Sequence, residues 1–331
     1  MKKQGNSFEE IKSRNTIKSN GNKTKTFLSK NTEEREGFSR ASDTQERVKV
    51  TKTDWGSVAD KYDKYLNSES NYHNEVILPN FLRMLGDVNK KNILEIACGQ
   101  GFFCEAIVKE AGENKISGSK KVQVTGFDLG TDLIKIAQQN AGKNKSDINY
   151  KVLNAENFAD EYEKNINKNE DKFDVIFCVL ALQNIENIKK VLENIKKVLK
   201  NKDEKSKQEA GKVIFIINHP AYRIPKSTSW GNVTELGAKE IQYRRVDKYM
   251  SEDKIKMDMT PAEKREAFKK YTYSYHRPLQ TYFKVFANLG FAVTKLEEWI
   301  SNKVSEGKNA DRENTARKEF PMFMCLEIKL I

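Results

Sequence analysis

The sequence predicts an α/β fold built on a doubly wound, mostly parallel sheet with helices on both faces. Between residues 92 and 218, short apolar runs long enough for buried strands alternate with amphipathic helical patterns. The first of these runs, at 93–97, breaks into a Gly-x-Gly turn and continues directly as a helical pattern. Helical crossovers between parallel strands are right-handed, which places helices on both sides of the sheet.

The remaining elements follow from the same two periodicities. Apolar spacing of three and four residues predicts two amphipathic helices before the first strand, at 54–66 and 72–85, the second ending at Gly86. The helix opened by Tyr275-His-Arg-Pro278 precedes two more strands at the carboxyl end of the chain. The predicted strands are 93–97, 122–128, 148–153, 173–183 with its exit, 212–218, 291–299 and 322–330, and the core helices are 102–111, 131–141 and 185–199.

The turn after the first strand has the features of a nucleotide pocket. Gly99 and Gly101 permit positive φ and close approach of a ligand, and the next helix begins with free N–H groups. The third glycine of the dinucleotide fingerprint is absent, because Cys104 stands at that position. Glu95 lies inside the strand, where a carboxylate is costly unless a cationic ligand or donor groups beside the loop pair with it.

The stretch E-x-A-C-G-x-G at 95–101 resembles the first motif of the class I S-adenosylmethionine-dependent methyltransferases, E/D-x-G/A-x-G-x-G. The stretch H-R-P-L-x-x-Y-F-x-x-F-A-x-L-G-F at 276–291 is similar to the tail of small-molecule members. The resemblance covers about 54–331. It implies a Rossmann-like, seven-stranded sheet with an antiparallel last strand, preceded by lid helices at 54–91.

The resemblance also implies that the cofactor is S-adenosyl-L-methionine. Asp128, at the tip of the second strand, would lie beside the glycine loop and accept both ribose hydroxyls, the alternative being a simple N-cap. The family contacts the adenine amino group with residues that match 154–156. The cofactor residues that the resemblance implies are Glu95, Ala97, Gly99, Gly101, Phe102, Asp128, Leu129, Asn154, Ala155, Glu156, Cys178, Val179 and Gln183.

The segment 219–275 leaves the fifth strand at its ligand-facing edge and is rich in aromatic residues and arginine. So long a segment is uncommon unless it works as a lid or binding loop, so we expect a substrate lid here. His219 and His276 flank the segment and are the candidate catalytic groups, although a lone histidine is more often structural. The candidate substrate-binding residues are Tyr62 in the first helix, and Arg223, Arg244 and Arg245, whose alternative role is in surface ion pairs with acids such as Asp247 and Glu240.

Composition sets the class of protein. The chain of 331 residues carries a net charge of +12. Residues 1–53 hold 13 Lys/Arg against 7 Asp/Glu, so half of the net positive charge lies in this segment. The segment is polar, and we expect it to be a disordered tail. The rest is spread through lysine-rich loops without an aromatic-interleaved patch. No apolar run approaches about 18 residues, no secretory h-region is present, and the four cysteines form no C-x-x-C pair, which favours a reducing cytoplasm and no metal site.

The function predicted is methyl transfer to a small-molecule acceptor by in-line displacement. A nucleic-acid or protein methyltransferase on the same core is the alternative, but the fourth strand exits as Cys-Val-Leu-Ala-Leu-Gln rather than the N/D-P-P-Y of base amino-methylation. A nicotinamide-dependent oxidoreductase is disfavoured by Glu95 and Cys104. A cofactor-binding protein without catalysis is distinguished only by turnover. The sequence does not indicate the acceptor atom or the oligomeric state.

Overall fold

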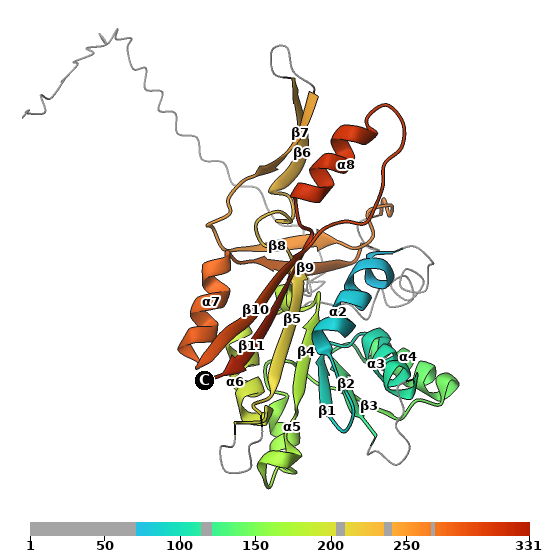
Figure 1. Ribbon diagram of the computed structural model, residues 1–331, viewed down its shortest axis with the longest axis vertical. Helices are drawn as coiled ribbons and strands as arrows, with labels where there is room; N and C mark the ends of the chain where they lie inside the picture. Colours follow the sequence, from blue (N-terminus) through green and yellow to red (C-terminus); the bar gives the residue numbers. More distant parts are fainter. Residues whose placement is uncertain (1–70, 114–120, 203–208, 235–239, 266–268) are drawn as a thin grey trace, which may run out of the picture. The chain divides into compact units, whose positions relative to one another are not determined.

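The computed structural model describes residues 71–113, 121–202, 209–234, 240–265 and 269–331 (Figure 1). The predicted tail at 1–53 and the predicted first helix at 54–66 lie outside the described residues. Of the expected lid helices, the structure describes a π-helical turn, His73–Ile77, that continues as α2 (Leu78–Leu85). Gly86 ends this helix with φ +69°, as the sequence predicts.

The central sheet has seven strands in the order β10-β11-β5-β4-β1-β2-β3. Strands β1 to β5 run parallel to one another, and β11 is antiparallel to both of its neighbours. The predicted fold class is therefore confirmed, including the antiparallel last strand. The strands are β1 (Asn92–Ile96), β2 (Gln123–Asp128), β3 (Ile148–Val152), β4 (Val175–Val179), β5 (Lys212–Asn218), β10 (Phe291–Trp299) and β11 (Phe323–Leu330).

The strand order reverses between β1 and β4. From β1 the chain moves to β2 and β3 on one side, and from β4 to β5 on the other. In open α/β sheets, ligands bind outside the carboxyl ends of the strands at such a switch point. The glycine loop that follows β1 lies at this point, so the topology itself selects the candidate site.

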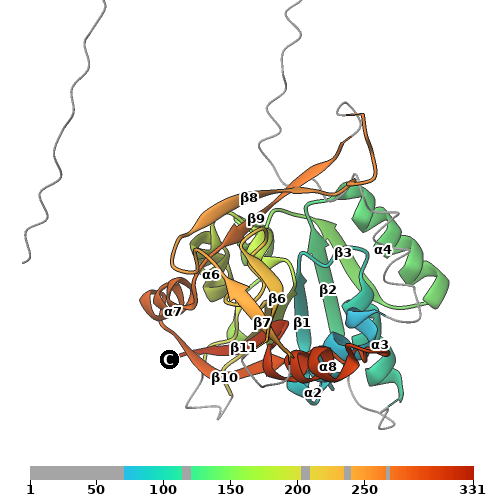
Figure 2. The same cartoon turned by 90° about the horizontal axis from the view of Figure 1, so that it is seen from above.

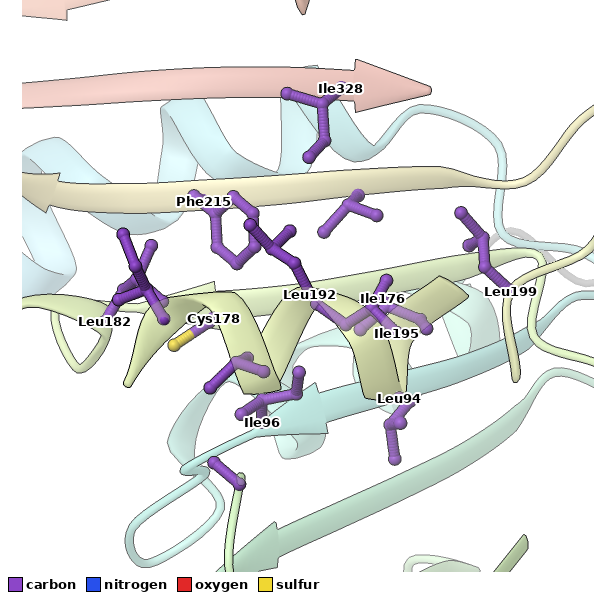
Figure 3. Packing of buried hydrophobic residues seen from close by; sticks show 14 of the residues in the cluster. Leu94, Ile96, Ile176, Cys178, Leu182, Leu192, Ile195, Leu199, Phe215 and Ile328 are labelled. Carbon is purple, nitrogen blue, oxygen red and sulfur yellow. The ribbon is translucent and has the colours of Figure 1, made fainter. Parts of the chain in front are cut away.

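Helices cover both faces of the sheet and enclose two apolar clusters. Residues of α5 (Ala159–Glu163), α6 (Ile188–Val198) and α7 (Leu279–Asn288) pack on one face, where Leu192 and Ile195 of α6 lie over Ile176 of β4 (Figure 3). Residues of α2, α3 (Phe102–Glu113) and α4 (Thr131–Asn144) pack on the other face. Helix α6 begins three residues later than predicted, because the Asn187 side chain caps it by accepting from the Lys190 N–H.

The segment 219–275 contains strands that the sequence analysis did not predict. It forms two antiparallel pairs, β6 (Thr228–Thr234) with β7 (Glu240–Val246) and β8 (Asp253–Asp258) with β9 (Tyr271–His276). Tyr275 and His276 end β9, so they do not open the next helix; α7 begins at Leu279 after Pro278. Helix α8 (Ala310–Glu319), also not predicted, packs against β7 (Figures 1 and 2).

None of the helices in the described part of the chain is long and apolar enough to cross a membrane.

Candidate functional site

The glycine loop has a left-handed backbone conformation at three alternate residues. Ala97, Gly99 and Gly101 all have positive φ, at +56°, +56° and +83°. The Cys98 N–H donates to the Phe127 carbonyl at 2.9 Å, which ties the loop to β2. The Gly101 N–H donates to the Cys98 carbonyl at 2.9 Å. The turn is therefore held by backbone contacts, and a small residue at 97 tolerates the left-handed conformation at moderate cost.

Gly101 is required by the protein interior as well as by any ligand. A Cβ added at this residue would lie 2.1 Å from the Tyr150 hydroxyl oxygen of β3. The Tyr150 hydroxyl donates to the Gly101 carbonyl at 3.3 Å, so ring and loop are in direct contact. The sequence predicts this glycine from ligand approach, and the structure adds a packing reason.

Glu95 is 2% exposed, and its carboxyl accepts a hydrogen bond from the Cys104 thiol at 2.9 Å. Burial raises the pKa of Glu95 to about 8, and the nearby charge of Asp128 acts in the same direction. The expected donor beside the loop is thus a thiol. Cys104, which breaks the dinucleotide fingerprint, supplies the partner that the buried acid needs.

Asp128 joins the tip of β2 to the glycine loop. One carboxylate oxygen accepts from the Gly99 N–H at 3.0 Å and the other from the Gly130 N–H at 2.8 Å. Burial raises the pKa of Asp128, and these backbone donors oppose the rise. Gly130, rather than Asp128, is the N-cap of α4, so the simple N-cap alternative does not describe this acid. A carboxylate has about four lone-pair sites, which leaves capacity for two hydroxyl donors.

Two apolar side chains remain exposed beside Asp128. Leu129 is 51% exposed and Val152 is 45% exposed, and Val152 is the register partner of Asp128 across β2 and β3. Exposed apolar surface at the carboxyl edge of neighbouring strands suits the faces of an aromatic base. Val152 was missed by the sequence analysis; its place as the last residue of the third strand is the signal that would have found it.

The segment 154–156 is a tight turn fastened to the core. The Asn154 side-chain oxygen accepts from the Glu156 N–H at 2.9 Å, while Ala155 is buried. The Glu156 carboxylate accepts from the Asn187 N–H at 3.1 Å, which connects the turn to the start of α6. Asn154 itself is exposed. The turn thus presents a polar rim beside Leu129 and Val152.

The exit from β4 contributes a buried polar atom that has no hydrogen-bond partner in the described part of the chain. Gln183 is 7% exposed, and its amide nitrogen donates to the Leu180 carbonyl at 2.6 Å. Its side-chain oxygen has no hydrogen-bond partner among the described residues. Val179 is buried at the strand end, and Cys178 lies in the cluster under α6, with a pKa raised to about 12 by burial (Figure 3). The Cys178 side chain is therefore part of the core.

His219 uses both ring nitrogens within the protein. Nδ1 accepts from the N–H groups of Ala221 and Tyr222 at 3.2 and 3.4 Å, and Nε2 lies 2.6 Å from a Glu298 carboxylate oxygen. Because Nδ1 accepts, Nε2 carries the proton and donates it to Glu298. The ring stacks on Tyr222 with centroids 4.7 Å apart, and burial lowers the pKa of His219. This arrangement fixes the start of the 219–275 segment to β10.

His276, at the end of β9, is 5% exposed, and its Nε2 lies 2.8 Å from the Tyr249 carbonyl oxygen. A carbonyl only accepts, so Nε2 is the protonated nitrogen and Nδ1 of a neutral ring remains the acceptor. Strand β9 packs against the turn Leu182–Asn184 that follows β4. His276 and Gln183 thus belong to contacting elements.

The three candidate arginines differ in their surroundings. Arg223 lies over the Phe323 ring at 5.3 Å. Arg244 donates from Nε and Nη2 to the Tyr222 carbonyl at 3.0 and 2.7 Å, so its fork binds the backbone. Arg245 forms an exposed ion pair with Asp247 at 2.6 Å, which is the alternative considered for it. Tyr62 lies outside the described residues.

The residues present fit S-adenosylmethionine. The glycine loop, Asp128, the exposed pair Leu129 and Val152, and the unpartnered oxygen of Gln183 lie at the carboxyl edge of the sheet around the switch point. Among the described residues, no group of three or more His, Cys, Asp or Glu is placed to hold a metal ion. Sheet order, antiparallel last strand and glycine loop together define the class I methyltransferase fold.

Comparison with known proteins agrees with this class. Residues 87–209 match a family described as a methyltransferase domain. Similar curated proteins include two ubiquinone biosynthesis O-methyltransferases. The one from Hydrogenovibrio crunogenus is 26% identical over 105 residues, which cover 32% of this chain and 36% of that one. The one from Glaesserella parasuis is 31% identical over 97 residues, which cover 29% of this chain and 36% of that one. The matched region therefore spans about a third of the length of these curated relatives.

A solved S-adenosylmethionine-dependent methyltransferase from Mesorhizobium loti shares the fold, with a TM-score of 0.51 at 20% identity. The match covers 76% of this chain and 96% of that one, so it extends well beyond residues 87–209.

Proposed function

We propose that this chain is an S-adenosylmethionine-dependent methyltransferase that transfers the methyl group to a small-molecule acceptor. The observation that carries the proposal is the position of Asp128, whose carboxylate accepts the N–H of Gly99 and faces the glycine loop at the topological switch point. An acid in this place selects a ligand with vicinal hydroxyls. The buried Glu95–Cys104 pair disfavours the alternative of a nicotinamide-dependent oxidoreductase.

Each part of the site has a distinct task in binding. The cofactor supplies an electrophilic methyl group on a sulfonium. Asp128 accepts the ribose hydroxyls, and Leu129 with Val152 flanks the base. The Gln183 side-chain oxygen accepts a hydrogen bond from the ligand, which removes the cost of leaving that oxygen unpaired.

Methyl transfer is an in-line displacement that depends on proximity and alignment, with a base where the acceptor must lose a proton. His276 is the better candidate for that base, because its Nδ1 is the acceptor nitrogen while Nε2 donates to Tyr249. His219 is better suited to positioning, since both of its ring nitrogens have partners. Arg223 remains a candidate for contact with the acceptor, and Arg244 and Arg245 shape the segment that surrounds it.

A small acceptor is supported by three features. The curated relatives are named for O-methylation in ubiquinone biosynthesis. The 219–275 segment, with two strand pairs, follows β5 at the carboxyl edge where an acceptor must lie. The sequence lacks the N/D-P-P-Y exit of base amino-methylation. The four cysteines are free and buried, which supports work in a reducing compartment such as the cytoplasm.

The test is turnover by the purified full-length chain. Incubated with S-adenosylmethionine and a panel of small phenols, amines and carboxylates, it should release S-adenosylhomocysteine with a matching mass gain on one acceptor class. The His276→Asn variant should bind the cofactor normally and transfer more slowly. Methylation of RNA or protein but of no small acceptor would favour the alternative on the same core, and tight binding of NAD would refute the proposal.

A further inference from the structure

The β8–β9 pair has two chemically different faces. Directly opposed residues share a face, as do alternate residues along a strand. Ile255, Thr272 and His276 are all less than 8% exposed and lie on the face turned toward the protein. The other face, which we term the Lys–Tyr face, consists of Lys254, Lys256, Asp258, Tyr271, Tyr273 and Tyr275.

Lysine and tyrosine side chains alternate in space on the Lys–Tyr face. Lys256 Nζ lies 3.6 Å from the Tyr271 ring centroid, and Lys254 Nζ lies 4.9 and 5.3 Å from those of Tyr273 and Tyr275. Both lysines are exposed and the three rings are partly exposed. The two lysines and the three tyrosines are at least 15 residues apart in the sequence, from Lys256 to Tyr271, so the sequence alone shows no aromatic-interleaved basic patch. The pairing of β8 with β9 brings them together.

We propose that the Lys–Tyr face binds a single-stranded nucleic acid. Three rings at alternate positions of one strand are spaced at about 7 Å, which suits bases stacked one after another on a sheet. The ammonium groups beside the rings supply the phosphate contacts, and the rings accept bases of any sequence. Lys254 and Lys256 shift from the rings toward phosphate oxygens when bases stack.

The surrounding charge is complementary to a polyanion. Between Lys248 and Arg277 the chain has eight Lys/Arg against five Asp/Glu. Lys226 donates to the Lys256 carbonyl at 2.9 Å, which brings another ammonium to the strand. Two carboxylates oppose a polyanion here. Asp258, opposite Tyr271 on this face, pairs with Lys269 at 3.8 Å. Glu186 accepts from Lys254 at 3.2 Å and from the Tyr275 hydroxyl at 3.0 Å. Glu186 therefore competes with phosphate for Lys254.

The test is fluorescence anisotropy of the full-length chain with a labelled oligouridylate of about 12 nucleotides, a length within the usual site sizes, without cofactor. Tyr273→Leu keeps apolar bulk but removes the stacking surface, and should weaken binding about tenfold. Lys256→Gln should weaken binding and lower the slope against log salt by about 1. Glu186→Gln should tighten binding, since it releases Lys254.

The control is Lys189→Gln, which removes an exposed lysine that also pairs with a glutamate, Glu193, on α6. It should bind the oligonucleotide as the unmodified chain does. The basic residues 1–53 are common to every variant, so their contribution cancels in each comparison. Unchanged circular dichroism and S-adenosylmethionine affinity show that the Tyr273→Leu variant is folded.

An oligothymidylate bound equally well also supports a single-strand site. The proposal is overturned if Tyr273→Leu binds like the unmodified chain, because charge alone would then explain retention. It is equally overturned if Lys256→Gln behaves like Lys189→Gln, or if anionic lipid vesicles bind with this Tyr273 dependence and the oligonucleotide does not. None of these outcomes bears on the methyltransferase proposal, which is tested by cofactor binding and turnover.

Discussion

Asp128 and Glu95 are two buried acids at the same edge of the sheet with opposite roles. Asp128 accepts two backbone N–H groups and remains ready to accept more, while Glu95 accepts a thiol hydrogen and has a pKa raised to about 8. At neutral pH a protonated Glu95 removes one negative charge from beside Asp128. The cationic sulfonium therefore meets a site whose charge depends on pH.

Replacing Asp128 by Ala should lower affinity for S-adenosylmethionine ten- to hundredfold. Hydrogen bonds to a charged acceptor contribute about 1.5–3 kcal/mol, and the substitution also frees the Gly99 N–H. Isothermal titration calorimetry measures the change, with the exposed Asp132→Asn of α4 as control. An unchanged affinity in Asp128→Ala would remove Asp128 from the cofactor site.

Glu95 should make the unliganded chain less stable as pH rises. Its pKa is raised from 4.5 in the unfolded chain to about 8 in the folded chain, so between these values the folded state holds a proton that the unfolded state has released. Stability attributable to Glu95 is thus present below about pH 4.5 and is lost progressively up to about pH 8. The loss is on the order of a few kcal/mol.

Urea unfolding at pH 5.5 and at pH 8 checks this expectation, because both values lie above an ordinary carboxyl pKa and span the interval in which Glu95 is expected to titrate. Glu95→Gln keeps an oxygen for the Cys104 thiol and does not titrate, so it should lose less stability over that interval than the unmodified chain. Equal losses in the two proteins would mean that Glu95 is ionised throughout.

Among the elements, the glycine loop combines a ligand requirement with a packing requirement. Gly101→Ala should reduce both stability and cofactor affinity, because the new Cβ would lie 2.1 Å from the Tyr150 hydroxyl at a φ of +83°. Gly112→Ala in α3 is the matched control, since nothing lies within 4 Å of its Cβ position. It should stabilise the chain by about 0.5–1 kcal/mol. Thermal unfolding of the two variants and of the unmodified chain measures both changes in stability.

His219 fixes the start of the 219–275 segment to β10 through Glu298, and this contact leads to a second prediction. His219→Ala removes the contacts to Glu298 and to the turn at 221–222, so transfer should slow roughly tenfold or more while cofactor affinity stays within about threefold. Glu298→Gln leaves an oxygen that accepts from the neutral ring and should transfer normally. Slow transfer in Glu298→Gln would mean instead that His219 works through a charged pair.

The elements predicted well are those with a strong period and a buried face. Strands β1, β2, β3 and β5 begin and end within one residue of the predicted positions, because their apolar runs have no alternative environment. Strand β4 begins two residues later than predicted and ends at Val179, and the predicted exit to residue 183 continues as the turn Leu182–Asn184. Strand β9 was missed although Y-T-Y-S-Y alternates, since tyrosine and serine give little hydrophobic contrast. Helix α8 was missed because its sequence, A-D-R-E-N-T-A-R-K-E, has almost no apolar stripe.

The relative positions of the candidate site residues were predicted as far as the backbone determines them. Glu95, the glycines and Asp128 follow from strand, turn and strand tip, and the structure brings them together. The partners of His219 and Arg244 could not be predicted, because they come from β10 and from a strand pair whose register the sequence does not give. Long-range pairing decides whether such a side chain faces a ligand or a carbonyl.

For the whole molecule, charge is distributed unevenly along the chain. Residues 1–53 carry half of the net charge and few apolar residues, so their deletion should leave transfer to a small acceptor unchanged. Steady-state rates of the full and shortened chains check this. If the natural acceptor were a nucleic acid, the shortened chain would instead methylate it with a higher KM that depends less steeply on salt.

The most direct measurement is calorimetric titration of the full-length chain with S-adenosylmethionine and, separately, with NAD. A class I methyltransferase site built on Glu95, the glycine loop and Asp128 predicts one-to-one binding of S-adenosylmethionine, lost or strongly weakened in Asp128→Ala, and no binding of NAD. Binding of NAD, or S-adenosylmethionine affinity that is absent or independent of Asp128, would contradict the account.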